Sequence, residues 1–277
     1  MATIQSLKKK LQVVRSTRKI TQAMKTASTV KYSKLTGLFS AYAEYCKQYK
    51  ELYKVFCDEF NARFSDVDFT APVCYVVISS NKGMCGSFNN ELFNFFLNVI
   101  SKDNNCIILS CGKKGNEFFS KKGIKTEKNY VFSDIPQYHE AEYLFGDIQR
   151  LIDDKKISSV KVVYPEYKNM IKQTPVICEF FGTEKGEEEH NEPLFVPDKE
   201  TVFEKFAEKV IATMLYKTIL EAALGAQAAT LTTMRSAFDT ASDYCVQLEA
   251  EINRKRQSQV TADVLEVSAE YSVNWEE

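Results

Sequence analysis

Apolar side chains near the N-terminus recur at every third or fourth position. This spacing places them along one side of an α-helix, which turns once per 3.6 residues. Only Gly37 lowers the helix propensity of the segment. The pattern therefore predicts one long helix over residues 1–60. The residues that carry it are Ile4, Leu7, Leu11 and Val14, then Ile20, Ala23, Met24, Ala27 and Val30, and later Leu38, Tyr42, Tyr45, Tyr49, Leu52, Phe56 and Phe60.

A second pattern of this kind fills the C-terminal segment, residues 198–277. It follows Pro197, and Asp198 is a suitable residue to cap the first turn of a helix. Gaps of three and four residues alternate along it, and such a repeat is typical of a coiled coil. The positions are Leu231, Met234, Phe238, Ala241, Cys245, Leu248 and Ile252.

The two predicted helices would be about 90 Å and about 110 Å long at 1.5 Å per residue. Neither can bury its apolar stripe inside a compact globule, so each most simply buries it against the other. Residues 227–242, QAATLTTMRSAFDTAS, are rich in Ala, Ser and Thr, which let two helix backbones approach closely. We therefore expect residues 1–60 and 198–277 to form a long antiparallel two-helix coiled coil.

The segment between the two helices, residues 70–197, has a different pattern. It contains all six prolines of the chain. Short apolar runs that read as buried strands alternate with helical patterns, which predicts βαβ units and a largely parallel sheet covered by helices. The strands are expected at Val73–Ser80, Cys106–Cys111, residues 160–167 and residues 174–181, and the helices at Ser87–Ile100, residues 116–122 and His139–Lys156. The predicted fold class is thus α/β, with a coiled coil and a central α/β domain.

Charge is unevenly distributed along the chain. The formal net charge is −1, yet the first 43 residues contain no acid. A basic segment of this kind suggests an acidic partner, which could be nucleic acid, anionic lipid or an acidic protein surface. Its nine cations are Lys8, Lys9, Lys10, Arg15, Arg18, Lys19, Lys25, Lys31 and Lys34.

Neither a membrane span nor a metal site is predicted. No apolar run approaches the roughly 18 to 20 residues that cross a bilayer, and the N-terminus lacks the pattern of a secretory signal. The eight cysteines are scattered without a CxxC pair, so we expect reduced, buried thiols. His139 and His190 do not stand in a zinc-binding spacing.

No segment shows a catalytic or cofactor-binding signature. The turn NKGMCGS, Asn81–Ser87, would be the best place for a phosphate, but it matches neither GxGxxG nor GxxxxGK[ST]. The run GKKGNE, Gly112–Glu117, has the wrong spacing for a P-loop. Both are expected to be ordinary turns, and we predict no catalytic residues and no cofactor.

The run INRKRQSQVTADVL, Ile252–Leu265, is the most unusual polar segment. If both helices leave the central domain at the same end, Met1 lies opposite about residue 257. The helix pair would then end near Arg256 and Gln257, and about 20 residues would project as a single helix some 30 Å long. The apolar residues of that tip would be exposed unless a partner surrounds them. They are Val260, Val264, Leu265 and Val267.

Four segments together resemble one protein family. KITQAMKTASTVKYSKL (Lys19–Leu35) and KGMCGSFN (Lys82–Asn89) are similar to the N-terminal helix and the strand-following turn of γ subunits of F-type ATP synthases. QAATLTTMRSAFDTAS (Gln227–Ser242) and NRKRQSQVTADVLE (Asn253–Glu266) resemble the C-terminal helix of that family. The matches stand in family order and spacing, so the resemblance covers the whole chain.

The resemblance implies a non-catalytic central rotor shaft with a Rossmann-like central domain. Its expected partners are the α and β subunits of an α3β3 ring, an ε/δ-type stalk subunit and the membrane c-ring, with no nucleic acid. The expected location is peripheral, on the cytoplasmic face of a bacterial inner membrane or on the matrix side in an organelle. By motif position, the residues expected to contact β subunits are Arg254, Arg256, Gln257, Ile20, Thr21, Met24 and Lys25, and the tip residues would form a bearing.

The chain departs from the family pattern at several positions, and three alternatives stay open. The departures are Gly225, Ala226, Thr230, Leu231, Phe238 and Ile252. They leave room for a γ-like shaft of an F1-like ATPase that is not coupled to an ion ring. The basic segment leaves room for a coiled-coil protein that binds nucleic acid, and the central domain for a nucleotide-using enzyme.

Overall fold

The computed structural model of the 277-residue chain describes residues 3–56, 71–101, 105–179, 195–196 and 198–273. Within them the chain forms two compact units. Unit 1 comprises residues 1–27 and 233–277, and unit 2 comprises residues 28–232. Two long helices, α1 (Ile4–Val55) and α6 (Lys199–Val273), contribute to both units. The predicted boundaries between the helices and the central domain fall in residues 57–70 and 180–197, which lie largely outside the described residues.

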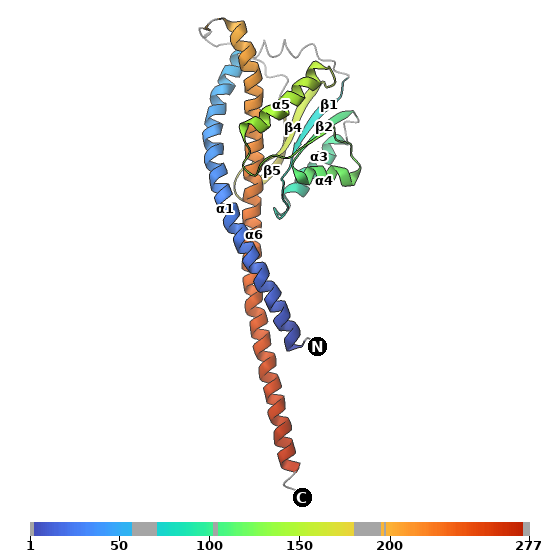
Figure 1. The fold of residues 1–277 in the computed structure, drawn as a ribbon, viewed down its shortest axis with the longest axis vertical. Helices are drawn as coiled ribbons and strands as arrows, with labels where there is room; N and C mark the ends of the chain where they lie inside the picture. The colour runs from blue at the N-terminus through green and yellow to red at the C-terminus, as the bar shows by residue number, and fades with distance from the viewer. Residues whose placement is uncertain (1–2, 57–70, 102–104, 180–194, 197, 274–277) are drawn as a thin grey trace. The chain divides into compact units, whose positions relative to one another are not determined.

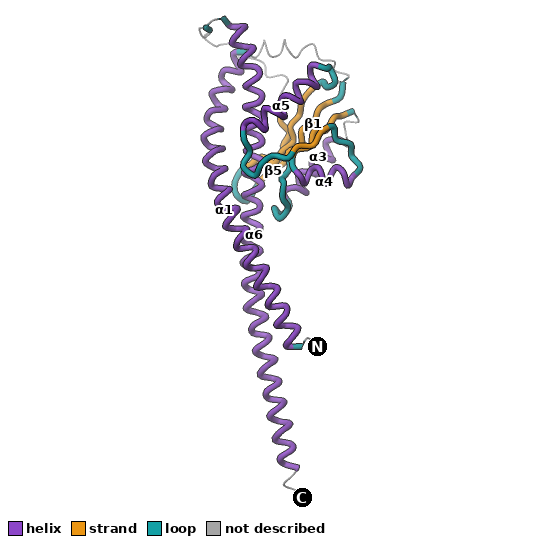
Figure 2. Tube along the Cα trace, viewed as in Figure 1, coloured by secondary structure: helices purple, strands orange, loops and turns teal. Residues whose placement is uncertain are grey.

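The sheet of unit 2 has five strands in the order β3-β2-β1-β4-β5. Figure 2 shows the strands in orange. β1 pairs in parallel with β2 and β4, β2 pairs in parallel with β3, and β4 and β5 form an antiparallel pair. The predicted largely parallel sheet is confirmed. The strands are β1 (Val73–Ile78), β2 (Cys106–Cys111), β3 (Lys128–Tyr130), β4 (Ser159–Tyr167) and β5 (Gln173–Glu179).

One strand was missed by the sequence interpretation. β3 has three residues, which is too short for an alternation of apolar and polar positions to be visible. It is held at the sheet edge by its pairing with the end of β2, where Cys111 is opposite Tyr130.

Helices cover both faces of this sheet (Figure 1). On one face, α3 (Phe88–Ile100) and α4 (Lys113–Lys122) bury Leu92, Phe96 and Phe119 against β-strand residues such as Tyr75. On the other face, α5 (Tyr138–Asp153) shares a core with α1 and α6. Burying one large apolar side chain stabilises a fold by about 1.5–3 kcal/mol, so this double covering accounts for the cohesion of unit 2.

In unit 2, α1 and α6 pack together mainly through aromatic rings. Tyr42 meets Tyr216 edge to face with ring centres 4.8 Å apart, and Tyr49 stacks on Phe206 at 5.4 Å. Residue numbers rise along one helix as they fall along the other, so the pair is antiparallel, as predicted. The predicted N-cap of α6 is also confirmed, because Asp198 Oδ1 accepts a hydrogen bond from the Thr201 amide at 2.8 Å.

In unit 1, the two helices meet through aliphatic side chains. Leu7 and Leu11 of α1 are buried against Cys245 and Leu248 of α6, with Val14 and Ile252 packed beside them. The predicted seam of α6 is confirmed. Met234, Ala241, Cys245 and Leu248 are buried, and Leu231, Phe238 and Ile252 are half-buried.

The predicted seam of α1 is confirmed at Tyr42, Tyr49 and Phe56 but is wrong between Ile20 and Leu38, where, of the predicted residues, only Met24 is half-buried. Ile20 and Val30 are 59% and 53% exposed, whereas Thr21 and Ser28 are buried. The buried line keeps the three-and-four spacing that starts at Leu7, because two helices that wind around each other bury one continuous seam with a period of about 3.5 residues. Burial of Thr21 is tolerated because its hydroxyl donates a hydrogen bond to the Arg18 carbonyl at 2.9 Å.

Candidate functional site on the terminal helix pair

Two contacts of cationic side chains join the helices of unit 1, one at the surface and one at the seam. Arg15 Nη2 lies 2.6 Å from Glu249 Oε1, and Lys25 Nζ lies 4.6 Å from the centre of the Phe238 ring. Arg15 and Glu249 side chains are about half exposed, at 54% and 46%, so the ion pair is worth at most about 1 kcal/mol. The apolar cluster of Leu7, Leu11, Cys245 and Leu248 therefore supplies most of the association.

The paired part of α6 ends close to the predicted place. Ile252 and Lys255 are the last half-buried side chains, and every described side chain from Arg256 to Ser268 is exposed. The helix itself continues to Val273. A single helix therefore extends past the paired segment of unit 1.

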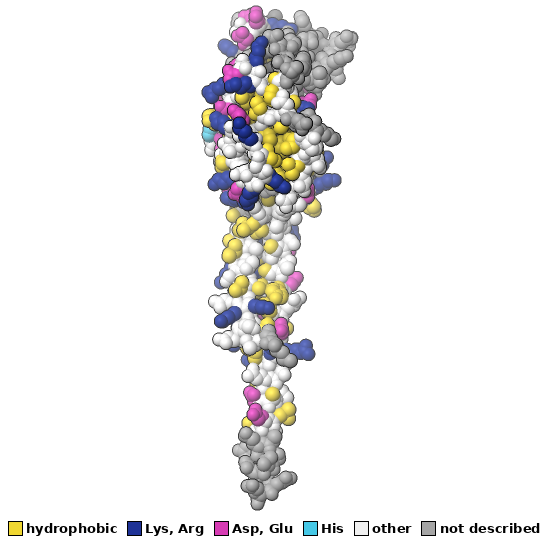
Figure 3. Space-filling view, turned by 90° about the vertical axis from the view of Figure 1, so that its right-hand side faces the viewer, with side chains coloured by type: hydrophobic (Ala, Val, Ile, Leu, Met, Phe, Trp, Pro, Cys, Tyr) yellow, Lys and Arg dark blue, Asp and Glu magenta, His cyan; other side chains and the backbone are white. Residues whose placement is uncertain are grey.

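Four apolar side chains of this single helix are exposed. Val260, Val264, Leu265 and Val267 have exposed fractions of 55%, 62%, 64% and 52%. In the space-filling view, hydrophobic side chains on the lower helical part stand among uncharged and charged ones (Figure 3). Burying each of them could contribute up to about 1.5–3 kcal/mol, so this surface is suited to a partner that encloses it.

Arg254, Arg256 and Gln257 are exposed residues of α6 at the start of that single helix. Arg254 and Gln257 are three residues apart and therefore share one side of α6. Within the part of the chain that the structure describes, none of the three side chains makes an ion pair or a hydrogen bond. Their guanidinium and amide groups can thus bind a partner without first breaking an internal contact.

The four predicted contact residues on α1 are placed differently from one another. Ile20 is exposed, and Met24 and Lys25 are half-buried. Thr21 is only 7% exposed and packs in the helix seam. Of the four residues, Thr21 therefore has the smallest exposed surface for a contact with a β subunit, and its contact stays a prediction.

A groove between the helices of unit 1 was not predicted from the sequence. It has a volume of about 680 Å³ and three cationic side chains, Lys8, Arg15 and Lys19, against one carboxylate, Glu249. The positions 8, 15 and 19 share one side of a helix, and this spacing was the available signal. The groove has an excess of positive charge and is suited to an acidic side chain.

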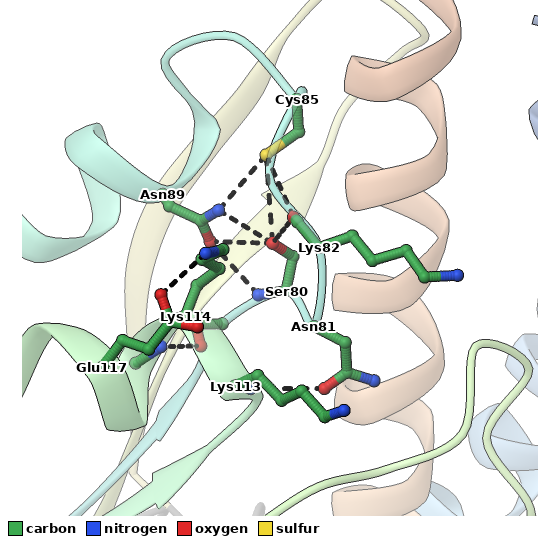
Figure 4. A network of polar contacts seen from close by, with 10 residues as sticks. Ser80, Asn81, Lys82, Cys85, Asn89, Lys113, Lys114 and Glu117 are labelled. Atoms are coloured by element: carbon green, nitrogen blue, oxygen red, sulfur yellow. Dashed lines mark hydrogen bonds and ion pairs between the residues drawn. The ribbon is translucent and has the colours of Figure 1, made fainter. Parts of the chain in front are cut away.

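The turn after β1, which the sequence interpretation weighed as a phosphate site, is closed on itself (Figure 4). Asn89 Nδ2 donates to Ser80 Oγ at 2.8 Å, and Asn89 Oδ1 accepts from the Ser80 amide at 3.1 Å. Ser80 Oγ donates to the Lys82 carbonyl at 2.7 Å. The Lys82 side chain points away from this network. These polar groups satisfy one another, as in an ordinary βα turn.

The cavity beside that turn is small. It has a volume of about 50 Å³ and is lined by residues such as Asn81, Gly112, Asp134 and Gln227. Small-molecule sites usually measure about 300–1,000 Å³. The cavity therefore has room for groups of the size of water rather than for a nucleotide.

The remaining sequence expectations concern cysteines, metals and membranes. Seven cysteines are free thiols, and Cys57 lies outside the described residues. Burial raises the pKa of Cys74 to about 12, so that thiol stays protonated at neutral pH.

Among the described residues, no group of three or more acidic, His or Cys side chains could hold a metal ion. Within the described ranges, no helix has the length and apolar character needed to cross a bilayer.

Three comparisons with known proteins agree with one another. A protein-family model described as ATP synthase matches residues 3–271. A chain named ATP synthase gamma chain from Rubrobacter xylanophilus is 26% identical over 282 residues, which cover 97% of each chain. Another of that name from Clostridium botulinum is 28% identical over 270 residues, covering 94% of each.

Solved structures show the same fold. The rotor of the Euglena gracilis mitochondrial ATP synthase has a TM-score of 0.69 at 16% identity, covering 93% of this chain and 98% of that one. The central stalk of the Tetrahymena thermophila mitochondrial ATP synthase has a TM-score of 0.61 at 19% identity, covering 79% and 99%. The predicted combination of a coiled coil and a Rossmann-like domain is confirmed. On the family match and the near full-length relatives, this chain belongs to the family of ATP synthase γ chains.

Proposed function

We propose that this chain is the central rotary shaft of an F-type ATP synthase. It couples ion-driven rotation to conformational change in the catalytic β subunits, for ATP synthesis or for hydrolysis in reverse. The observation that carries the proposal is the exposed single helix at the end of the helix pair, in a chain of the γ family. A helix with four exposed apolar side chains needs an enclosing partner, and an α3β3 ring supplies one.

The two sides of unit 1 suit a shaft that acts on several identical subunits in turn. Lys8, Arg15 and Lys19 make one side basic, while Val13 and Ile20, which are seven residues apart, make another side apolar. A partner can be shifted between conformations only by differences in contact free energy. Rotation of such an asymmetric surface presents different contacts to each β subunit, which is the requirement for sequential conformational change.

Specific contacts follow from the placement of the site residues. Arg254, Arg256 and Gln257 are proposed to bind loops of β subunits through charge-assisted hydrogen bonds, which are strong and can be remade at each step. Ile20, Met24 and Lys25 are proposed to contact β subunits from α1. The apolar residues of the single helix, Val260, Val264, Leu265 and Val267, are proposed to form a bearing that turns within the ring.

The rest of the complex follows from the same proposal. The α/β domain would contact an ε/δ-type stalk subunit and the membrane c-ring, so the chain is peripheral to the membrane through the complex. The chain is proposed to lie at the cytoplasmic face of a bacterial inner membrane, or on the matrix side of the membrane in an organelle. The chain supplies no catalytic group and no cofactor site. We propose two functional parts: a shaft made of residues 1–60 and 198–277, and a central domain made of residues 70–197.

Native purification of the chain from its own cell tests the proposal. Co-purification of α, β, ε- or δ-type and ring subunits is expected. Recovery of α and β subunits without ring subunits would indicate a γ-like shaft that is not coupled to an ion ring. Binding to DNA or RNA that weakens steeply with salt, without α and β subunits, would contradict the proposal in favour of a nucleic-acid-binding coiled coil.

A further inference from the structure

The loop before α5, residues 131–137, joins separate parts of unit 2. Asp134 Oδ2 accepts hydrogen bonds from Lys31 Nζ of α1 and from Lys82 Nζ of the turn after β1, the latter at 2.7 Å. Tyr216 of α6 donates its hydroxyl to the Pro136 carbonyl at 3.0 Å. One loop of the α/β domain therefore binds both long helices.

The end of β4 makes a second connection of this type. The hydroxyl groups of Tyr167 and Tyr32 of α1 are 2.6 Å apart. The amide of Tyr167 donates to Oε1 of Glu221 of α6 at 3.1 Å, and Glu221 is buried. Tyr167 is thus bound to α1 through its side chain and to α6 through its backbone.

The two contacts on α1 come from consecutive residues. Lys31 and Tyr32 project from the helix about 100° apart, so the domain holds α1 from two directions. Apolar packing is non-directional, whereas hydrogen bonds weaken steeply when distance or angle changes. Sliding or turning α1 against the domain therefore breaks one contact or the other, even where the aromatic and aliphatic packing could adjust.

We propose that the Lys31–Asp134 and Tyr32–Tyr167 contacts lock α1 to the α/β domain, so that torque applied to the domain turns the shaft. This inference rests on the proposed function as a rotary shaft. α1 continues from unit 2 into unit 1 as one helix, Ile4–Val55, and it carries the rotation onward. Lys31, Tyr32, Asp134 and Tyr167 are positioning residues, because they act through the helix and not on a β subunit.

Two double variants test the lock from its two sides. Lys31→Ala with Tyr32→Phe changes α1, and Asp134→Asn with Tyr167→Phe changes the domain. Asp147→Asn is the matched control. Asp147 also accepts a hydrogen bond from a lysine, Lys128, at 2.6 Å, but this bond joins β3 to α5 inside the domain.

The measurement uses the chain assembled with α and β subunits and fixed to a surface through the ring. A bead is attached to the domain through Lys121→Cys on the exposed side of α4, and the width of its angular distribution is recorded in a stalled complex. Both double variants are expected to broaden the distribution, and Asp147→Asn is expected to leave it unchanged. The single variant Lys31→Arg, which retains a cation, is expected to keep it narrow.

Two outcomes would overturn the lock: equal widths in all variants, or an equal broadening by Asp147→Asn, which would indicate general loosening. Failure of the unsubstituted chain to assemble with α and β subunits would instead count against the proposed function. The lock is then decided on the isolated chain by hydrogen exchange of α1 amides at residues 28–36. Faster exchange in the double variants than in Asp147→Asn supports it, and no difference overturns it.

Discussion

The ammonium nitrogen of Lys25 lies 4.6 Å from the centre of the Phe238 ring, at a seam position of the helix pair in unit 1. Both side chains are half-buried. A cation over an aromatic face can occupy a position that two aliphatic side chains usually fill, because the negative face of the ring compensates part of the lost hydration. The aromatic residue that departs from the family pattern thus has a structural partner in this chain.

Phe238→Leu is expected to destabilise the chain by about 1 kcal/mol, because it removes the ring that faces Lys25 but keeps an apolar side chain. Urea unfolding of the isolated chain measures this change. Tyr244→Leu is the matched control, since Tyr244 is an exposed aromatic residue on the same helix. Equal effects of the two substitutions would show that the Lys25 contact adds no stability.

Changing Arg254, Arg256 and Gln257 together to Ala is expected to leave the folding of the isolated chain unchanged. All three side chains are exposed, and Ala favours helix, so the free energy of unfolding should move by less than about 0.5 kcal/mol. The coupling of ATP hydrolysis to ion transport in the assembled complex should fall. Unaltered hydrolysis and coupling would remove the proposed contacts with β subunits, and Gln247→Ala serves as the exposed control on the same helix.

Val264→Asp with Leu265→Asp tests the bearing. Both positions are exposed, so circular dichroism of the isolated chain should be almost unchanged. In the complex, two carboxylates enclosed by apolar surface are costly, and we expect weaker assembly and slower rotation. Val264→Ala with Leu265→Ala is the uncharged control and should have a smaller effect. Normal rotation with the charged pair would mean that the single helix is not enclosed.

Two glycines are expected to respond in opposite directions to Ala. Gly112 has φ of +99°, and an added Cβ would lie 2.2 Å from the Ser79 carbonyl oxygen, so Gly112→Ala should cost at least about 2 kcal/mol. Gly37 is helical with open space around it, and Gly37→Ala should stabilise by about 0.5–1 kcal/mol. Thermal unfolding of the two variants measures both changes. A Gly112→Ala variant as stable as the unsubstituted chain would contradict the close approach of Gly112 to the Ser79 carbonyl.

The buried carboxyl of Glu221 should make stability depend on pH. Burial raises its pKa above the usual 4.5, and the hydrogen bond from the Tyr167 amide opposes this only in part. The folded chain therefore holds the proton more tightly than the unfolded chain. The contribution of Glu221 to the free energy of unfolding falls as pH rises from about 4.5 through the folded pKa. Glu221→Gln should remove that fall in denaturant titrations at several pH values. An unchanged pH profile would contradict it.

Asp147 is expected to make stability depend on pH in the opposite direction. Burial by itself raises its pKa, but hydrogen bonds from Lys128 and Tyr130 outweigh burial and hold the pKa below the usual 3.8. The contribution of Asp147 to the free energy of unfolding is thus present above about pH 3.8 and is lost as pH falls through the folded pKa. Asp147→Asn should flatten the acidic limb of the profile and leave the limb above pH 4.5 to Glu221.

Much of the fold could be predicted because its elements are long and strongly patterned. The seam of α6 from Met234 to Leu248 was read directly from gaps of three and four residues, and the parallel strands β1 and β2 from short buried runs. The end of the helix pair near Arg256 followed from the helix lengths, on the premise that both helices leave the central domain at the same end. Arg254, Arg256 and Gln257 were assigned as contacts through the family motif, since an exposed Arg or Gln has no pattern of its own, whereas the apolar tip residues followed from the helix lengths.

The sequence by itself determined the two long helices and the longer strands, because periodicity of apolar residues and local propensity act within a few residues, whereas the three-residue strand β3 depends on its pairing with β2. The tertiary structure decided which side of α1 is buried. Ile20 and Thr21 both lie on helical stripes, but the position of α6 selects the seam, and Thr21 is buried while Ile20 is exposed. It also decided the contacts of Lys31 with Asp134 and of Tyr32 with Tyr167, which are 103 and 135 residues apart. Such pairs depend on the packing of the whole α/β domain against the helices, and no local pattern encodes them.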